Sequence, residues 1–338
     1  MAEPAVAPVA DEAVLVDGHG RVARDLRISV TDRCDLRCTY CMPAEGLEWL
    51  PLDQQLTFEE ITRLAGCFVA WGIRSIRLTG GEPLVRPHLH RLVAELATLG
   101  LDDLALTTNG TTLARQAERL ADAGLDRVNV SLDSLVAHRF AEMTRRDALD
   151  RVLAGVDAAR RAGLDPVKVN CVVVAGRNDD EVLDFVDFAR STGCEVRFIE
   201  DMPLGGGARW TDELVLPAAE LLARIEVHHL LVPEQRGSEP AASFTFADGS
   251  PGRVGVIASV TEPFCEQCDR LRLTSDGQLR TCLFAHEETD LRTPLRNGAC
   301  DEELLEIVGQ AVAAKGPGHA IGRPEFEQPV RLMSRIGG

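Results

Sequence analysis

Hydrophobic and polar residues along the chain follow two alternating patterns. Short runs rich in β-branched and other apolar residues predict strands at residues 26–31, 75–79, 103–107, 127–132, 167–174 and 195–200. Between these runs, apolar residues recur at helical spacing. Phe58, Ile61, Leu64, Ala65 and Phe68 share one helix face, and Val182, Phe185, Val186 and Ala189 repeat that spacing. The pattern therefore predicts strands and helices in strict alternation.

Five glycines stand where the predicted helices end, and a strand follows each of them within a few residues. They are Gly72, Gly100, Gly124, Gly163 and Gly193. Glycine is common at this position because it adopts the left-handed backbone conformation cheaply. Successive strand–helix units predict right-handed crossovers and a parallel sheet. This pattern leaves two folds open, a doubly wound open sheet and a partial (β/α) barrel.

The regular alternation covers only the middle of the chain. Residues 1–20 are rich in Ala, Pro, Val and acidic residues, and we expect them to form a flexible extension. After about residue 230, proline and glycine interrupt short strand-like runs at 243–246 and 253–257. The sequence thus predicts an α/β unit at 21–230 and a smaller antiparallel or irregular β-rich region at 231–338.

Composition narrows the possible functions. The 338 residues carry a formal net charge of −17, which argues against binding to nucleic acid or to an anionic membrane. No run approaches the roughly 18 apolar residues of a membrane helix. The N-terminus lacks the features of a signal peptide, so we expect a cytoplasmic protein whose ten cysteines stay reduced. Grouped thiols in a reducing compartment favour metal or redox chemistry.

The first cysteine group follows the first predicted strand as Cys34-x3-Cys38-x2-Cys41. Three thiolates on one loop can converge on a soft metal centre, but they lack the fourth ligand of a structural zinc site. A four-iron cluster held by three cysteines keeps one iron open for a ligand. With the aromatic Tyr40 before its last cysteine, this motif resembles the signature of the radical S-adenosylmethionine enzymes. The resemblance implies that a [4Fe–4S] cluster at these cysteines binds and cleaves S-adenosylmethionine.

The Gly-Gly-Glu-Pro segment at 80–83 follows the second predicted strand. Its glycines let the backbone approach a ligand closely, and Glu82 can accept hydrogen bonds from an amine. The segment resembles the part of the radical enzymes that contacts the amino group of the cofactor. Because the active sites of barrel folds lie at the carboxyl ends of the strands, as these loops do, we predict a partial (β/α)6 barrel.

A second cysteine group, Cys265-x2-Cys268 and Cys282, lies in the C-terminal region. The spacing alone fits zinc and iron–sulfur equally well, and Cys300 is a possible fourth ligand. Beside a radical-cofactor motif, a second [4Fe–4S] cluster with an open iron is the better interpretation. The other cysteines lack cluster spacing, and we expect Cys67, Cys171, Cys194 and Cys300 to be buried, inert thiols.

The paired cysteine groups and several other segments resemble the GTP 3′,8-cyclases, the family that performs the first step of molybdenum cofactor biosynthesis. The matching segments are RISVTDRCDLRCTYCMP, RLTGGEPLVR, TTNG, VNVSLDSL, VKVN, FCEQCDRLRLTSDGQLRTCL and the terminal MSRIGG. The resemblance implies a lyase that converts GTP to (8S)-3′,8-cyclo-7,8-dihydroguanosine 5′-triphosphate. The second cluster would bind the guanine, and the tail with Gly337 and Gly338 would reach the active site.

The resemblance also implies roles for individual residues. The expected GTP contacts are Arg27, Arg77, Thr107, Lys168, Arg270, Leu271 and Arg272, and the expected cofactor contacts are Tyr40, Gly81, Glu82, Ser131 and Met202. Arg270 and Arg272 alternate along the chain, so both guanidinium groups lie on one strand face, where they can hold phosphate oxygens. They are also expected to assist the final reduction of the product.

The expected partners follow from the same resemblance: a second copy of the chain, a flavodoxin or ferredoxin as electron donor, and cyclic pyranopterin monophosphate synthase as the next enzyme. Two alternatives stay open. One is a peptide-modifying radical maturase with an auxiliary cluster, although its usual auxiliary region has more cysteines. The other is a non-catalytic iron–sulfur or zinc protein, which leaves the Gly-Gly-Glu-Pro segment unexplained. Analysis of the bound metal separates this second alternative from the enzyme.

Overall fold

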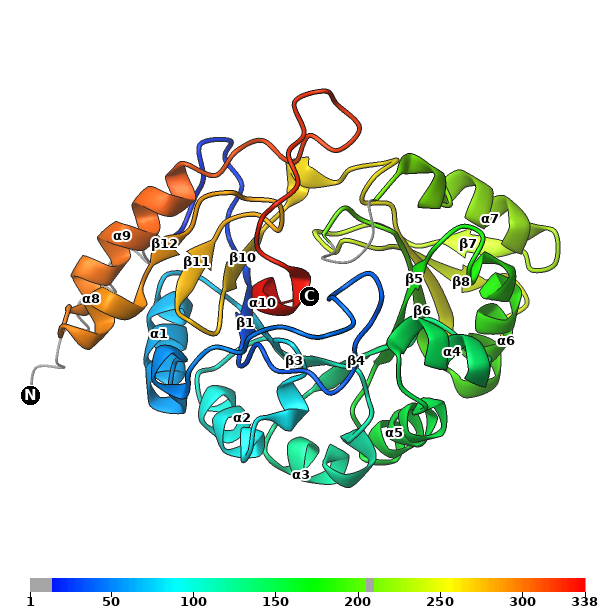
Figure 1. Ribbon diagram of the computed structural model, residues 1–338, viewed down its shortest axis with the longest axis horizontal. Helices are drawn as coiled ribbons and strands as arrows, with labels where there is room; N and C mark the ends of the chain where they lie inside the picture. Colours follow the sequence, from blue (N-terminus) through cyan, green and yellow to red (C-terminus); the bar gives the residue numbers. More distant parts are fainter. Residues whose placement is uncertain (1–13, 205–209, 338) are drawn as a thin grey trace, which may run out of the picture.

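The computed structural model of the chain describes residues 14–204 and 210–337, and it is built around one curved, twelve-stranded sheet (Figure 1). The strands of its central part are β1 (Asp25–Ser29), β2 (Ser75–Thr79), β3 (Asp103–Thr108), β4 (Arg127–Ser131), β5 (Val167–Val173) and β6 (Glu195–Glu200). They pair in chain order and all are parallel. The predicted partial barrel is confirmed, and the predicted strand bounds differ from these by at most two residues at each end.

Helices cover the outer face of the sheet. They are α1 (Phe58–Ala70), α2 (Leu89–Ala97), α3 (Ala117–Asp122), α4 (Ala137–Thr144), α5 (Leu149–Arg161), α6 (Val182–Thr192) and α7 (Ala218–Glu226). Thr57 and Glu60 form a capping box at the start of α1. All five glycines expected after helices have a positive φ, between 72° and 98°. These helices therefore end where the sequence predicts, and after each of these glycines the chain enters the next parallel strand of the barrel.

The C-terminal region adds strands to both edges of this barrel instead of forming a body of its own. Its elements are β7 (Leu231–Pro233), β8 (Ala242–Phe246), β9 (Arg253–Ile257), β10 (Arg270–Leu273), β11 (Gln278–Arg280), β12 (Thr289–Asp290), α8 (Arg292–Arg296), α9 (Asp301–Ala313) and α10 (Met333–Ile336). Strand β9 pairs with β6, and β10 pairs with β1, both in parallel. Only the outer strands are antiparallel, so the expectation of an antiparallel or irregular region holds in part.

The segment just before β1 differs from the flexible extension expected at residues 1–20. Leu15 is buried and donates its backbone N–H to the carbonyl of Trp71, and Val16 forms an antiparallel bridge with Val22. Residues 14–20 thus form an ordered turn: Leu15 and Asp17 are buried and Leu15 is attached to the end of α1, while the other residues of the turn are exposed. Residues 1–13 lie outside the described part.

Within the part of the chain that the structure describes, we find no helix with the length and apolar character needed to cross a membrane.

Candidate functional site

The first cysteine group lies on the loop that leaves the carboxyl end of β1. Cys34, Cys38 and Cys41 are free, partly buried thiols. Burial raises the pKa of Cys34 to about 12 and that of Cys41 to about 11. Buried thiols of this kind become thiolates when a cationic centre compensates the negative charge, which a metal cluster does. The donor set therefore fits a soft metal cluster.

The Gly-Gly-Glu-Pro loop lies directly against the segment that leads into these cysteines. A Cβ added at Gly81 would lie 2.3 Å from the carbonyl oxygen of Arg33, and one at Gly80 would lie 2.5 Å from that of Thr31. Gly81 donates its N–H to Thr31, and Glu82 donates to Arg33, both at 2.7 Å. The two glycines thus allow the backbone of residues 80–83 to lie against the backbone that leads into Cys34. Their expected close approach to a ligand stays a prediction.

The carboxylate of Glu82 is buried and already accepts three hydrogen bonds from this chain. Its donors are the N–H of Leu84, the hydroxyl of Thr108 and the N–H of Asn109. Burial raises its pKa to about 7, although these hydrogen bonds act in the opposite direction. In this structure Glu82 fixes the loop after β3 to the Gly-Gly-Glu-Pro loop, and its contact with a cofactor stays a prediction.

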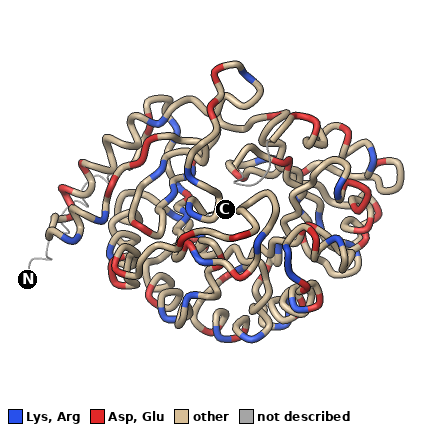
Figure 2. Tube along the Cα trace, in the orientation of Figure 1, with Lys and Arg blue, Asp and Glu red and all other residues tan. Residues whose placement is uncertain are grey.

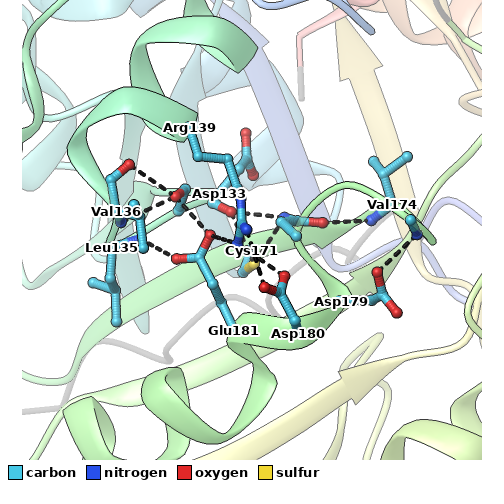
Figure 3. A network of polar contacts seen from close by, with 12 residues as sticks. Asp133, Leu135, Val136, Arg139, Cys171, Val174, Asp179, Asp180 and Glu181 are labelled. Atoms are coloured by element: carbon cyan, nitrogen blue, oxygen red, sulfur yellow. Dashed lines mark hydrogen bonds and ion pairs between the residues drawn. The ribbon is translucent and has the colours of Figure 1, made fainter.

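Tyr40 is fixed by a carboxylate that follows β4. Its hydroxyl donates to Asp133 Oδ2 at 2.6 Å, and Asp133 Oδ1 accepts from the N–H of Val172 at 2.9 Å. Figure 3 shows Asp133 beside Cys171, near the ion pair of Arg139 and Glu181. Glu181 also accepts the N–H of Leu135, which fixes the loop that carries Asp133. The cysteine loop is thereby attached to the strand ends of the barrel.

The second cysteine group lines a cavity where the barrel strands and the C-terminal region meet, which we call the main cavity. Cys265, Cys268 and Cys282 all face this cavity. Burial alone would raise the pKa of Cys268, but the charges of Arg270 and Lys315 outweigh it and lower the pKa to about 7. Arg270 Nη2 lies 3.3 Å from Cys268 Sγ. A thiolate is therefore favoured at Cys268, as metal ligation requires.

The remaining cysteines follow the sequence prediction with one exception. Cys67, Cys171 and Cys194 are buried, as expected. Cys300 is exposed and caps the N-terminus of α9, which corrects the expectation that it is a buried thiol. It does not line the cavity with the second cysteine group. Among the described residues, no three His, Cys, Asp or Glu side chains converge on a site for a single metal ion.

Four arginines form a basic cluster on one wall of the cavity. Arg27 of β1 lies between Arg77 of β2 and Arg272 of β10 in the strand register, and Arg270 is two residues away on β10. Figure 2 shows basic residues gathered near β1 and β10, beside the C-terminus. Burial and the neighbouring charges of Arg77 and Arg272 lower the pKa of Arg27 well below its usual value. Such a cluster is electrostatically unfavourable until an anion binds it.

Buried nitrogen atoms of this cluster lack protein partners. The Nε atoms of Arg27, Arg77 and Arg270 have no hydrogen-bond partner among the described residues. Buried polar atoms in folded proteins nearly always have a partner, so these unpaired donors indicate a ligand that accepts hydrogen bonds. The cluster is therefore a candidate site for a polyanion.

The C-terminal tail enters the cavity beside the arginine cluster. The carbonyl oxygen of Gly337 accepts a hydrogen bond from Arg272, and the backbone N–H of Ser334 donates to Cys41. Outside the cavity, Arg331 pairs with Asp276 at 2.8 Å and with Glu288 at 2.7 Å. The tail therefore contacts both the first cysteine group and the arginine cluster. Gly338 lies outside the described residues.

The cavity contains most, but not all, of the residues expected to bind the substrate. Arg27, Arg77, Thr107, Arg270 and Arg272 line it, as does Met202 from the cofactor set. Leu271 is fully buried in the hydrophobic core, because alternation along β10 turns its side chain to the opposite face. Lys168 lies in a neighbouring cavity, where it pairs with Glu195 at 3.3 Å.

Of the remaining cofactor residues, Tyr40 lines a smaller pocket that it shares with Met202, and Ser131 lies at the carboxyl end of β4.

The structure adds residues that the sequence analysis did not single out. Asn129, Asn170, Arg197, Ser259 and His319 also line the main cavity. The signal for the first three is the alternation of polar residues within otherwise apolar strands, as in 127–131 and 167–170. Ser259 and His319 lie outside the strands, and no sequence pattern marks them.

Comparison with known proteins agrees with this geometry. Residues 28–189 match the model of the radical SAM superfamily, and residues 194–321 match that of Molybdenum Cofactor Synthesis C. The chain is 51% identical over 343 residues to a GTP 3′,8-cyclase of Corynebacterium glutamicum, covering 98% of this chain and 91% of the relative. It belongs to the GTP 3′,8-cyclase family. A relative from Streptomyces coelicolor with the same name is 52% identical, covering 96% of both chains.

Solved structures support the fold of this GTP 3′,8-cyclase family member. The crystal structure of Streptococcus suis SuiB bound to S-adenosylmethionine matches with a TM-score of 0.59 at 14% identity, covering 92% of this chain and 78% of that chain. At that identity the match shows the fold alone. Membership of the radical SAM superfamily implies a [4Fe–4S] cluster and S-adenosylmethionine.

Proposed function

We propose that this chain converts GTP to (8S)-3′,8-cyclo-7,8-dihydroguanosine 5′-triphosphate, the lyase reaction that opens molybdenum cofactor biosynthesis. The observation that carries the proposal is the buried arginine cluster in a cavity that also holds the second cysteine group. Four arginines converge there, and against the effect of burial all four lower the pKa of Asp25, so their positive charge exceeds that of this one carboxylate until an anion binds. The names of relatives about 50% identical over nearly the whole chain support GTP as that anion.

In this proposal the arginine cluster binds the triphosphate. Arg27, Arg77, Arg270 and Arg272 come from three adjacent strands, so their guanidinium groups can bind several phosphate oxygens at once. Thr107 lies on the same cavity wall and offers a hydroxyl to the nucleotide. Several fixed contacts orient the ribose and the base of one molecule, which matters because the new bond joins two atoms of that molecule.

The cysteine groups are assigned to two clusters. Cys34, Cys38 and Cys41 hold the superfamily's [4Fe–4S] cluster, and Cys265, Cys268 and Cys282 hold a second one that binds the guanine. When bound, the first cluster and S-adenosylmethionine supply one-electron chemistry that removes a hydrogen atom from the ribose C3′. Tyr40, Gly81, Glu82, Ser131 and Met202 bind the S-adenosylmethionine.

The protein's own contribution is orientation and the exclusion of water. The walls of the cavity and the C-terminal tail, as far as Gly337, would enclose the reacting atoms. Enclosure limits side reactions of a radical with solvent. Arg272 lies between the tail and the cavity, so it is placed to bind the nucleotide and to assist the final reduction of the product.

Several expected partners belong to the same proposal. The reaction consumes electrons, which a flavodoxin or ferredoxin supplies in the cytoplasm. The product passes to cyclic pyranopterin monophosphate synthase, and the enzyme is a homodimer.

The test uses anaerobically reconstituted protein, S-adenosylmethionine, a reductant and GTP deuterated at C3′. Mass spectrometry follows the deuterium, and we expect it in 5′-deoxyadenosine. Formation of 5′-deoxyadenosine without deuterium would refute GTP as the substrate, and its complete absence from cluster-loaded protein would refute the enzyme. Cys265→Ala and Cys300→Ala form a matched pair, because only the first removes a cavity thiol. We expect cyclisation to be lost in the former and retained in the latter.

A further inference from the structure

Two cations and two carboxylates form a closed group that joins the main cavity, which Arg197 lines, to the neighbouring cavity, which Lys168, Glu195 and Glu239 line. Glu195 pairs with Lys168 at 3.3 Å and with Arg197 at 2.5 Å. Glu239 pairs with the same two cations, with Lys168 at 3.6 Å and with Arg197 at 2.7 Å. Each carboxylate therefore bridges both cations, and the formal charges of the group sum to zero.

The two carboxylates are held very differently. Glu195 lies within β6 and its side chain is 6% exposed, whereas the side chain of Glu239 is 54% exposed. Glu239 belongs to the loop between β7 and β8, and no strand pairing fixes it. Burial opposes ionisation of Glu239, but Arg197 and Lys168 outweigh it and lower its pKa. Glu195 is a permanent counterion, while Glu239 reaches the cations from a surface loop and can leave at modest cost.

The cations of this group continue the basic wall of the main cavity. Arg197 lines that cavity together with the arginine cluster, and Pro240, the neighbour of Glu239, lines it too. Lys168 lines the neighbouring cavity and shares both carboxylates with Arg197. Without Glu239, Lys168 and Arg197 would present an uncompensated positive charge at the end of the arginine cluster.

We propose that Glu239 occupies a phosphate subsite, and that a phosphoryl group of the bound nucleotide displaces it from Lys168 and Arg197. A carboxylate and a phosphate offer similar paired oxygens to these two cations, so one replaces the other without leaving a buried charge unpaired. Glu239 thus lowers the affinity for polyphosphates and favours ligands that supply the full negative charge. This inference rests on the proposed function for its ligand, a nucleoside triphosphate.

The geometry also accounts for the position of Lys168. The family resemblance implies a contact between Lys168 and GTP, yet the structure places its ammonium group against two carboxylates. Departure of Glu239 would free one side of Lys168 while Glu195 keeps the other side neutralised. The ion pair of Lys168 with Glu239 is then the ligand-free state of the site, and the contact of Lys168 with GTP is its ligand-bound state.

The test measures the dissociation constants of GTP and of inorganic tripolyphosphate on the anaerobic, cluster-loaded protein by calorimetry. Glu239→Gln keeps the shape of the side chain but removes its charge, and we expect both ligands to bind at least about 5-fold more tightly. Glu234→Gln is the matched control, since Glu234 lines the same neighbouring cavity but pairs with Arg253. We expect it to bind both ligands as the wild type does.

A second measurement separates competition from a structural role. In a Lys168→Met background, the gain from Glu239→Gln should shrink, because one of the two cations that Glu239 masks is gone. Hydrogen exchange of residues 234–240 should rise when tripolyphosphate binds the wild type, and it should already be high in Glu239→Gln.

Two results would overturn the inference. One is equal or weaker binding of both ligands by Glu239→Gln, which would mean that Glu239 only positions Arg197. The other is exchange in the loop that tripolyphosphate leaves unchanged. If the wild type binds tripolyphosphate but not GTP, the proposed substrate is wrong, and tripolyphosphate still tests Glu239. If neither ligand binds, both proposals fail.

Discussion

The close approach of the Gly-Gly-Glu-Pro loop to the first cysteine loop gives a sharp prediction for Gly81→Ala. The added Cβ would lie 2.3 Å from the carbonyl oxygen of Arg33 and 2.6 Å from that of Asp32. Ordinary contacts begin at 3.4 Å, so one backbone must move by about 1 Å, the difference between 3.4 and 2.3 Å. Both obstacles are backbone atoms, and a change of rotamer cannot relieve the overlap.

The expected magnitude follows from the contacts that this movement breaks. Overpacking costs about 1–3 kcal/mol. The hydrogen bonds from Gly81 to Thr31 and from Glu82 to Arg33 contribute about 1 kcal/mol each. We therefore expect Gly81→Ala to lower the free energy of unfolding by about 3–5 kcal/mol. Because Arg33 precedes Cys34, the variant should also lose iron from the first cysteine group.

The assay combines urea unfolding of the anaerobically purified protein with its iron content per chain. Gly66→Ala is the control, because a Cβ at Gly66 meets only Leu99 Cδ2, at 4.0 Å. Gly66 lies inside α1, where alanine is favoured over glycine by up to about 1 kcal/mol, so this variant should be slightly more stable. Gly81→Ala protein with the wild-type urea midpoint and full iron content would refute the reasoning.

Three further predictions concern buried charges. Arg27→Met removes a like charge from the arginine cluster, so thermal denaturation should show it about 1–2 kcal/mol more stable, while GTP titration should show at least about 10-fold weaker binding. Burial raises the pKa of Asp201 to about 6. As the pH rises from 4 to 6, this carboxyl ionises in the unfolded chain before it does so in the folded protein, so the free energy of unfolding of the wild type should fall by up to about 3 kcal/mol relative to Asp201→Asn. Arg331→Ala removes the pairs with Asp276 and Glu288, so hydrogen exchange of residues 332–337 should rise about 10-fold.

Two of these variants have a control on the surface, one for Asp201→Asn and one for Arg331→Ala. Asp187→Asn changes a 70% exposed carboxylate and should show no such pH dependence. Arg253→Ala removes an exposed pair with Glu234 and should leave exchange in the tail unchanged. A less stable Arg27→Met protein, or a constant stability difference for Asp201→Asn across pH 4–6, would contradict the electrostatic argument. Unchanged exchange in Arg331→Ala would show that other contacts hold the tail.

Local sequence patterns predicted the barrel well because each strand–helix unit carries its own signals. The strand at Ser75–Thr79 and the helix end at Gly72 depend only on neighbouring residues, and the structure has both where the patterns place them. The packing of residues 14–20 could not be predicted in this way. Leu15 is buried by a distant contact with Trp71, and no periodicity within a short segment reports such a contact.

Apart from the spaced cysteines and the Gly-Gly-Glu-Pro segment, the cavity lining can be predicted where alternation on a strand reveals which side chains face inward. Arg270 and Arg272 follow this rule, and so do Asn129 and Asn170, which line the same cavity. The ion pairs of Lys168 did not follow from the sequence. Glu239 comes from a loop 71 positions further along, and only the folded chain brings the two together.

One topological feature joins the acidic chain to its anionic ligand. Because β10 pairs in parallel with β1, Arg272 lies beside Arg27, and Arg77 of β2 lies on the other side. The cysteines before β10 and after β11 are thereby brought into the same cavity. The C-terminal region thus supplies both the second cysteine group and half of the basic cluster. Because Arg27 and Arg77 come from the barrel and Arg270 and Arg272 from the C-terminal region, the candidate polyanion site forms only when both parts of the chain are folded together.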